Sequence, residues 1–133
     1  MIFMLDTNIC IYTIKQKPQK VIDRVRALRM SELGTSSIVL SELEYGAEKS
    51  SNPVKNKVAL MQFLAGIDIV GYDAAAARHY GEIRIYLESN GQTIGAMDML
   101  IAAHARSLGV ILVTNNEKEF RRIPGLKIEN WAL

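Results

Sequence analysis

The sequence predicts an α/β fold, with a mostly parallel sheet between layers of helices. Short strand-like runs alternate with segments in which apolar residues recur at the helical period. The first run, Ile2–Leu5, is apolar at every position, as is typical of a strand buried on both faces. The 133 residues suffice for one domain with a real core and are too few for two, so residues 1–133 are expected to form a single domain.

Five short runs bounded by turn-forming or polar residues are the expected strands. They lie at Ile2–Leu5, around Gly34–Ser37, and at Ile67–Val70, Val110–Val113 and Leu126–Ile128. Because helical segments separate these runs, neighbouring strands are connected by crossovers and the sheet is expected to be mostly parallel.

Between the first two runs, a helix is expected from about residue 18 to residue 30. Pro18 suits its first turn, because proline lacks the N–H group that would be unpaired there. Val21, Val25 and Leu28 then lie on one face, at the spacing of an amphipathic helix.

Two consecutive helices are expected between the second and third runs. Ser36 or Ser37 can cap the first, which would end near Lys49, because a serine hydroxyl accepts a hydrogen bond from a free N–H group of the first turn. The second helix follows Pro53. The pair forms one insertion into an otherwise alternating pattern.

Two more helices are expected before the fourth run. One spans about Ala74–Glu88 and ends at Asn90-Gly91, a sequence typical of helix C-termini. The next begins after Gly95, which lets the chain turn, and ends before Gly109.

Composition excludes several classes of protein. Hydrophobic residues make up 49% of the chain and charge is moderate, which argues against disorder. The single cysteine, Cys10, cannot form an internal disulfide, so nothing indicates secretion. The N-terminal apolar stretch is too short for a signal peptide, and no run approaches the length needed to span a membrane. A cytoplasmic protein without membrane contact is expected.

Positive charge is concentrated in one part of the chain. The net charge is only +2, but Lys15 to Arg29 contains six basic residues and one acid, Asp23. A second cluster comprises Lys49, Lys55 and Lys57. Such clusters are either solvated helix faces or surfaces that hold phosphates.

The first run ends on a carboxylate, Asp6, followed by Thr7 and Asn8. In an open parallel sheet, ligands bind at the carboxyl ends of the strands. Asp6 is therefore a candidate site residue, although a strand-end aspartate can also cap the next helix or form a turn.

Two further acids lie among apolar helical neighbours. The residues one helical turn before and after Glu42 are mostly apolar. Glu44 lies about 200° away from Glu42 around the helix axis. A charge among apolar neighbours is costly unless it is paired, but a glutamate head can also reach water. Asp98 lies in the first turn of its helix, where the helix dipole alone favours an acid. Ala102 and Ala103 would let that helix pack closely on the sheet.

The fourth run, Val110–Val113, ends on Thr114, Asn115 and Asn116, much as the first ends on an acid. Asn116 with Glu119 three residues later fits a capping box, which would give both a structural role.

The acids Asp6, Glu42 and Asp98, with Asn116 and Glu119 as further candidates, offer hard oxygen ligands. Carboxylates held together repel one another and need a counterion, and Mg²⁺ or Mn²⁺ suits oxygen ligands. Such an ion activates water and stabilises charge on a phosphate. The chain has no Gly-rich phosphate loop, and its two histidines lie in helical patterns, so a zinc site or a Cys–His nucleophile pair is poorly supported.

Together these residues resemble the PIN-domain ribonucleases, most closely the VapC toxins of bacterial toxin–antitoxin operons. The stretches that carry the resemblance are FMLDTNICIYTIK, SSIVLSELEYGAEKS, IGAMDMLIAAHA and LVTNNEKEFRRIPGLKIENW, which follow this order nearly end to end. The resemblance implies a single PIN domain with three α/β/α layers and a sheet of about five strands in the order 3-2-1-4-5. The first and fourth strands then flank the switch point, which brings Asp6 beside the Thr114–Asn116 turn.

By the same resemblance, Asp6, Glu42 and Asp98 are the catalytic and metal-holding acids of a Mg²⁺- or Mn²⁺-dependent endoribonuclease. Many relatives have an acid where Asn116 stands, so Asn116 or Glu119 is the candidate for a fourth ligand. The candidates for positioning the substrate are the polar residues that follow the two strand ends: Thr7, Asn8, Thr114 and Asn115.

The resemblance also implies partners. The RNA would be a tRNA, with the anticodon stem-loop of initiator tRNA as the cleaved region in similar proteins of enteric bacteria. A VapB-like antitoxin would inhibit a toxin homodimer within a larger complex and would alone contact operator DNA. Some of the apolar residues Ile9, Ile11 and Tyr12 can form a groove for an antitoxin segment, whose arginine would pair with the acids.

Two other interpretations share these features. A receiver-like phosphoacceptor domain also gathers acids around magnesium, but it usually has an acidic pair after its first strand, where this chain has DTN. A catalytically weak PIN fold that serves as an RNA-binding module is favoured by Asn116 and disfavoured by the three intact acids.

Overall fold

The sheet is parallel and lies at the centre of the molecule. The computed structural model describes residues 1–133. The strands are β1 (Phe3–Leu5), β2 (Leu33–Ser36), β3 (Asp68–Val70), β4 (Ile111–Val113) and β5 (Lys127–Glu129). All four pairings are parallel, and the order is β3-β2-β1-β4-β5. The expected strand order is therefore confirmed.

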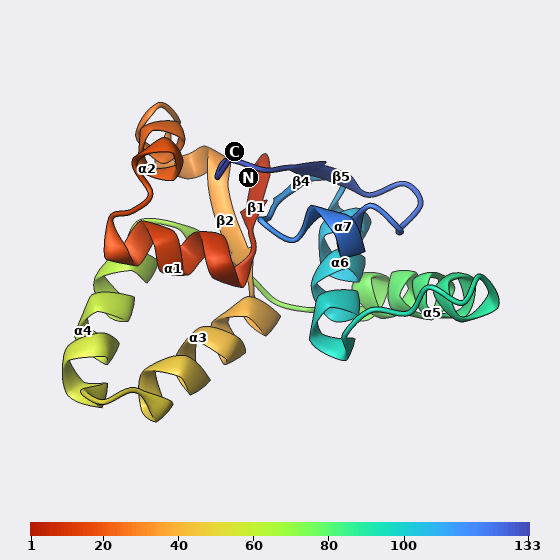
Figure 1. Cartoon of the computed structure of the whole chain (residues 1–133), viewed down its shortest axis with the longest axis horizontal. Helices are drawn as coiled ribbons and strands as arrows, with labels where there is room; N and C mark the ends of the chain where they lie inside the picture. Colours follow the sequence, from red (N-terminus) through yellow and green to blue (C-terminus); the bar gives the residue numbers. More distant parts are fainter.

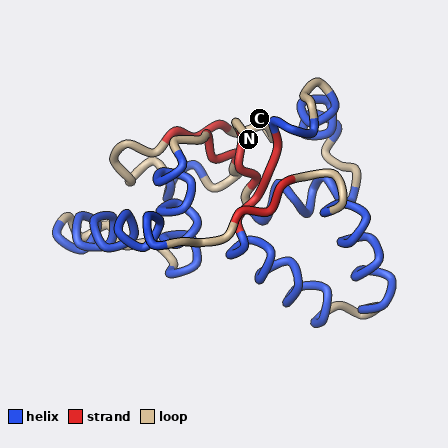
Figure 2. Tube along the Cα trace, turned by 180° about the vertical axis from the view of Figure 1, so that it is seen from behind, coloured by secondary structure: helices blue, strands red, loops and turns tan.

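Helices cover both faces of this sheet. They are α1 (Thr7–Lys15), α2 (Gln19–Arg26), α3 (Ser37–Lys49), α4 (Pro53–Leu64), α5 (Ala74–Ser89), α6 (Ala96–Leu108) and α7 (Glu117–Phe120). The chain moves from β1 to β3 in one direction and returns to β4 and β5 in the other. Right-handed crossovers therefore place the two sets of helices on opposite faces. Figures 1 and 2 show α1–α4 grouped on one side of the sheet and the α5–α6 hairpin on the other.

The helix expected over residues 18–30 is shorter than predicted. It ends at Arg26, and a separate 3₁₀ turn covers Met30–Glu32. Arg29 is extended between them, and its backbone N–H donates to the Glu32 carboxylate at 3.2 Å. This local bond starts a new turn, so apolar periodicity alone overestimated the length of the helix.

The two serines that were alternatives for capping α3 have different roles. The Ser36 hydroxyl accepts a hydrogen bond from Ile38 N at 3.0 Å and is the cap. The Ser37 hydroxyl accepts instead from Tyr72 N at 3.0 Å, which ties the start of α3 to the segment after β3.

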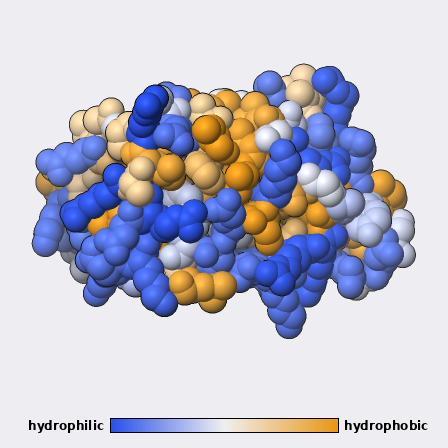
Figure 3. Space-filling view, turned by 90° about the horizontal axis from the view of Figure 1, so that it is seen from above, coloured by the Kyte–Doolittle hydropathy of each residue, from blue (hydrophilic) through white to orange (hydrophobic).

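The core lies against β1 and β4. Met4 and Leu5 are fully buried, and so are Ala102 and Ala103 in the middle of α6. Trp131 packs edge-on against Phe3, with ring centroids 5.3 Å apart, and closes the core near the C-terminus. On the face that carries both chain ends, apolar atoms lie among hydrophilic side chains (Figure 3). No helix is long and apolar enough to cross a membrane.

The topology brings two strand ends together. Asp6 follows β1 directly, and its N–H donates to Val113 O, at the end of β4, at 2.9 Å. Thr114 follows β4, and its N–H donates to Glu129 O at 2.9 Å. The residues after β1 and β4 therefore share the carboxyl edge of the sheet, at the switch point where ligands bind in such folds.

Close packing of α6 on the sheet gives a first prediction. Ala102→Leu should lower the free energy of unfolding by about 1–3 kcal/mol, because a fully buried position cannot take the added carbons without strain. Ala77→Leu, on the exposed side of α5, is the matched control and should change stability little. Urea denaturation measures both; equal stability of the two variants would contradict this packing.

Candidate functional site

Asp6 lies at the centre of the candidate site. Its side chain is 4% exposed, and both of its oxygens accept hydrogen bonds. Oδ1 accepts from Thr7 N at 2.7 Å, which caps α1, and Oδ2 accepts from the Thr114 hydroxyl at 2.7 Å. Burial raises the pKa of Asp6, these two bonds lower it, and the nearby Glu42 carboxylate raises it further. Asp6 therefore caps a helix and belongs to a group of interacting acids at the same time.

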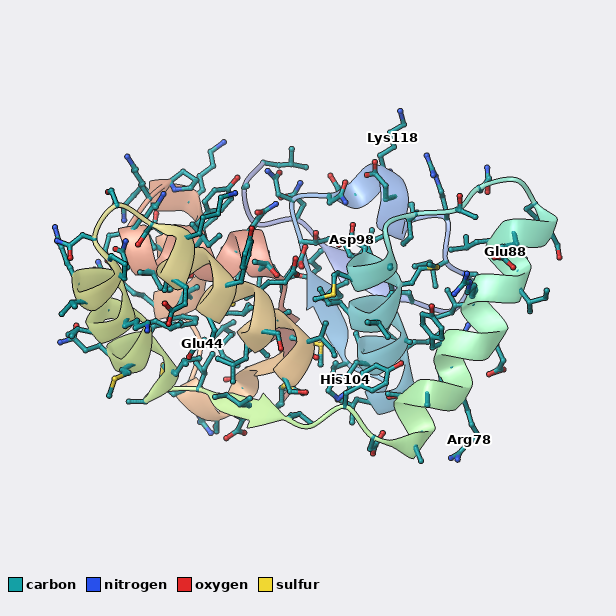
Figure 4. All side chains as sticks on the ribbon, turned by 90° about the horizontal axis from the view of Figure 1, so that it is seen from below. Glu44, Arg78, Glu88, Asp98, His104 and Lys118 are labelled. Carbon is teal, nitrogen blue, oxygen red and sulfur yellow. The ribbon has the colours of Figure 1, made fainter.

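Glu42 reaches the same place from α3. The side chain is half-buried, and its Oε1 accepts a hydrogen bond from the Thr7 hydroxyl at 2.7 Å. Thr7 thus holds Asp6 through its backbone and Glu42 through its side chain. Glu44 is exposed and lies away from Asp98, as Figure 4 shows. The prediction that these two glutamates face different surroundings is confirmed.

Asp98 joins the group from the first turn of α6, and it is half-buried. Its pKa rises to about 6, first because of burial and then because of the carboxylates of Asp6, Glu42 and Glu119. The helix dipole alone would lower this pKa, so the neighbouring acids outweigh it. Carboxylates that follow β1 and that lie on α3 and α7 therefore all act on Asp98.

The capping box predicted for Asn116 and Glu119 is not formed. Asn116 occupies the N-cap position of α7, but its side chain makes no bond to the backbone of that helix. Its Nδ2 instead donates to Asp98 Oδ2 at 3.4 Å. The Asn116 backbone N–H, which a capping box would donate to the Glu119 carboxylate, donates instead to the Thr114 hydroxyl at 2.9 Å, so other partners replace those of the box.

Thr114 connects Asp6 with Asn116 and, through Asn116, with Asp98. It is fully buried, its hydroxyl donates to Asp6, and the same oxygen accepts from Asn116 N at 2.9 Å. A continuous path of hydrogen bonds thus runs from Asp6 through Thr114 and Asn116 to Asp98. Of the residues predicted to position a substrate, Thr7 and Thr114 hold acids in this structure.

The other two residues predicted to position a substrate, Asn8 and Asn115, are exposed beside the site. Asn115 Nδ2 donates to the Tyr12 hydroxyl at 3.0 Å. Sequence reasoning did not predict this pair, because no short motif connects residues so far apart along the chain. Their proximity follows only from the pairing of β1 with β4.

Cysteine chemistry finds no support here. Cys10 is fully buried in α1, and burial raises the pKa of its thiol. The thiol lies 3.8 Å from Leu5 O, toward the interior of the fold. A buried, protonated thiol is a poor nucleophile.

The donor set suits a hard divalent cation. Its members are carboxylates, hydroxyls and an amide, which are ligands for Mg²⁺ or Mn²⁺ rather than for soft metals. As the side chains stand, no three histidine, cysteine or acidic residues are arranged to hold an ion. Hydrogen bonds from Thr7, Thr114 and Asn116 occupy the acids instead. The pKa of Asp98 is raised by burial first and then by the neighbouring carboxylates, and a bound cation would offset both effects.

A groove begins beside Glu42. It has a volume of about 230 Å³ and lies between α1, α3 and α4. Its walls are mainly apolar, with Ile11, Ile14 and Leu43 among them, and Gly46 leaves space at one side. Ile9 is fully buried in the core and takes no part in it.

Comparison with models of protein families matches this chain to a known domain. Residues 3–126 match the model of the PIN domain. A tRNA(fMet)-specific endonuclease VapC from Shigella flexneri is 51% identical over 130 residues, which is 98% of each chain. A ribonuclease VapC2 from Rickettsia felis is 46% identical over 132 residues, again 98% of each chain.

Solved structures of VapBC complexes contain chains that resemble this one in fold and sequence. The toxin–antitoxin complex VapBC2 of Rickettsia felis, bound to a DNA fragment from its promoter, contains a chain with a TM-score of 0.91 and 44% identity, which covers 98% of this chain and 99% of that one. DNA-bound VapBC from Salmonella typhimurium contains one with a TM-score of 0.91 and 47% identity, covering 97% of each.

Repulsion among the acids gives a second prediction. The pKa of Asp98 is about 6 in the folded state and 3.8 when unperturbed, so protonation of Asp98 favours folding and this stabilisation is lost as the pH rises through 6. Asp98→Asn imitates the protonated form. In EDTA it should raise the Tm by a few degrees at pH 8, and this gain should vanish below about pH 4.

Thermal unfolding between pH 4 and pH 8 measures this difference. Asp68→Asn, on the exposed edge strand β3, is the control and should show no such dependence on pH. A Tm that falls in Asp98→Asn at every pH would mean that this carboxylate supports the fold, contrary to the prediction.

Proposed function

The chain belongs to the PIN-domain family and, within it, to the VapC ribonucleases, and we propose that it is a metal-dependent endoribonuclease acting as the toxin of a toxin–antitoxin pair. One observation carries the proposal: Asp6, Glu42 and Asp98 lie at the carboxyl edge of the sheet, held by hydrogen bonds from Thr7, Thr114 and Asn116. Uncompensated acids at a switch point are expected where a metal-dependent site operates.

Asp6, Glu42 and Asp98 would hold the ion, and Glu119 would supply the fourth carboxylate in place of Asn116. A bound Mg²⁺ or Mn²⁺ would lower the pKa of a water molecule and neutralise charge on the phosphate. Asn116 lies close enough to orient either Asp98 or a water molecule through its amide. This assignment explains why an amide is tolerated at a position where relatives have an acid.

The surrounding residues keep the acids in place before any cation binds. Thr7 fixes one oxygen each of Asp6 and Glu42, and Thr114 fixes the second oxygen of Asp6. Metal sites depend on such outer hydrogen bonds for the orientation of their ligands. A carboxyl with a pKa of about 6 also gains or loses a proton readily near neutral pH, as Asp98 would have to when it exchanges a proton for a cation.

The proposed substrate is RNA, and specifically tRNA. The Shigella flexneri relative is a tRNA(fMet)-specific endonuclease, and half of its residues are identical to those of this chain over nearly its whole length. We therefore propose cleavage in the anticodon stem-loop of initiator tRNA. Two cations near the site support an RNA substrate: Lys15, the last residue of α1, lines the same groove as Glu42, and Lys17 follows in the next turn.

The proposed inhibitor is a VapB-like antitoxin bound in the groove between α1, α3 and α4. Related structures are complexes of a VapC toxin with its antitoxin, some of them on promoter DNA. The apolar walls suit a peptide segment, and Glu42 at the border of the groove would attract an arginine from it. We further propose a toxin homodimer in a larger complex that reaches operator DNA only through the antitoxin.

Catalysis gives the third prediction. Asp6→Asn, Glu42→Gln and Asp98→Asn should each lower RNA cleavage by at least about a hundredfold while the fold persists, because each removes a charge that the ion needs. EDTA should abolish cleavage, and Mn²⁺ should restore it. Glu44→Gln is the matched control, since Glu44 is an exposed glutamate on another side of α3.

Cleavage of total RNA and of initiator tRNA by purified, partner-free protein tests this prediction, with circular dichroism to verify folding. Full activity of Glu42→Gln, or cleavage in EDTA, would refute the assignment. Cuts outside the anticodon stem-loop would refute only the substrate.

Inhibition gives the fourth prediction. The chain alone should arrest bacterial growth, and a small protein encoded beside it should restore growth. Gly46→Trp should stay toxic and escape this rescue, because a side chain at Gly46 meets open space and would fill the groove. Gly81→Trp, on α5 and equally unobstructed, should remain toxic and be rescued. Full rescue of Gly46→Trp would place the antitoxin elsewhere.

A further inference from the structure

A second hollow lies beside the first and has a different lining. It has a volume of about 330 Å³ and is formed by Ile11, Tyr12, Lys15, Lys17 and Pro18, at the end of α1 and in the turn that follows. Ile11 and Lys15 line both hollows, which are therefore adjacent. We call this second space the Tyr12 hollow.

The Tyr12 hollow is connected to the acids. Asn115 donates to the Tyr12 hydroxyl, and the preceding residue, Thr114, donates to Asp6. Along the helix, Tyr12 lies five residues after Thr7, a rise of about 7.5 Å. A strand of RNA whose phosphate lies at Asp6 would therefore place a neighbouring nucleotide within reach of the hollow.

The cations of this hollow are free to bind an anion. Lys15 and Lys17 are exposed, and neither takes part in an ion pair. Arg24, from the same basic cluster, is engaged differently: it pairs with Glu129 at 3.0 Å and stacks over Trp131 at 4.9 Å. The basic cluster thus contains one cation, Arg24, that is already paired with an acid, and lysines that face solvent beside the hollow.

We propose that the Tyr12 hollow is a nucleotide subsite for single-stranded RNA next to the scissile phosphate. A base stacks on the ring of Tyr12, beside Pro18, and Lys15 and Lys17 contact the backbone phosphates. Aromatic rings flanked by cations are the usual means of holding single-stranded nucleic acid, because every base offers a face for stacking. The proposal rests on the proposed ribonuclease function and adds a substrate-binding site to it.

The lining favours RNA over a protein segment as the occupant. An acidic centre repels a polyanion, so cations beside it are required to hold the substrate, and the lysines of the hollow stand in that position. The groove along α3 and α4 is lined by the acid Glu42, which disfavours a polyanion and suits a peptide that carries an arginine, whereas no acid lines the Tyr12 hollow. Tyr12 is also half-buried and held through its hydroxyl, so its ring needs little ordering when a base binds.

The test combines binding and kinetics. The probe is a fluorescein-labelled single-stranded RNA oligonucleotide, bound in EDTA and followed by anisotropy over a salt series; cleavage of the same RNA is measured with Mg²⁺. Tyr12→Leu removes the aromatic face, and Tyr12→Phe keeps it but loses the bond to Asn115. Lys15→Gln with Lys17→Gln removes both charges, and Lys127→Gln, an exposed lysine on β5, is the control.

We expect Tyr12→Leu to weaken RNA binding about tenfold, with the loss in KM rather than in kcat, since no reacting atom lies in the hollow. Tyr12→Phe should stay within about twofold of the wild type. The double lysine variant should reduce the slope of log K against log salt concentration by about 1.4, or 0.7 for each lost contact. Lys127→Gln should bind as the wild type does.

Several outcomes would overturn the proposal. If Tyr12→Phe binds as weakly as Tyr12→Leu, Tyr12 acts by holding Asn115 and not by stacking. If all variants bind RNA normally but lose affinity for the small protein encoded beside the gene, the hollow is a protein interface. If the wild type cleaves RNA and Tyr12→Leu binds and cleaves it equally well, only the proposed subsite is wrong. If the wild type cleaves no RNA, the proposed function is wrong and the subsite with it.

Discussion

Repulsion among carboxylates is the constraint on which this structure depends. Asp6, Glu42, Asp98 and Glu119 come from four separate segments, and the pKa of Asp98 is raised by burial and, after it, by the other three carboxylates. Such a group costs stability unless the rest of the molecule holds it in place. The parallel order of the strands, with β1 beside β4 at the switch point, provides the edge on which the acids meet. The hydrogen bonds of Thr7, Thr114 and Asn116 then limit how far the acids can move apart.

The two layers of helices have different tasks. On one face, α6 is built of small and apolar residues in its middle, so it packs closely on the sheet and delivers Asp98 from a rigid position. On the other face, α1, α3 and α4 leave a groove and the Tyr12 hollow open at the surface. A rigid layer thus fixes the acids, and a more open layer is available for an RNA strand and an inhibitor.

The residues proposed to bind the RNA backbone and those proposed to hold the cation have opposite charges and lie in different places. The acids gather where a cation would be held, whereas the free lysines lie at the far end of α1. The intervening helix is short, so an RNA backbone can contact both. Arg24, which belongs to the same basic cluster in the sequence, pairs with Glu129 and lies over the ring of Trp131 at the surface. The charge of a segment therefore does not reveal which of its cations are available to a ligand.

The sequence by itself determined the strands and most helices, because these depend on apolar periodicity. It singled out three acids as candidates on separate grounds: Asp6 follows a strand end, Glu42 has apolar neighbours, and Asp98 lies in the first turn of a helix. It also indicated a fourth polar position, but it misjudged the role of Asn116. A capping box is a local pattern, whereas Asn116 bonds to Asp98, which lies 18 residues earlier on another helix. Likewise, Thr7 meets Glu42 and Asn115 meets Tyr12 only because separate strand ends become neighbours. Tertiary structure decided these pairings, since hydrogen bonds select partners by distance in space and not along the chain.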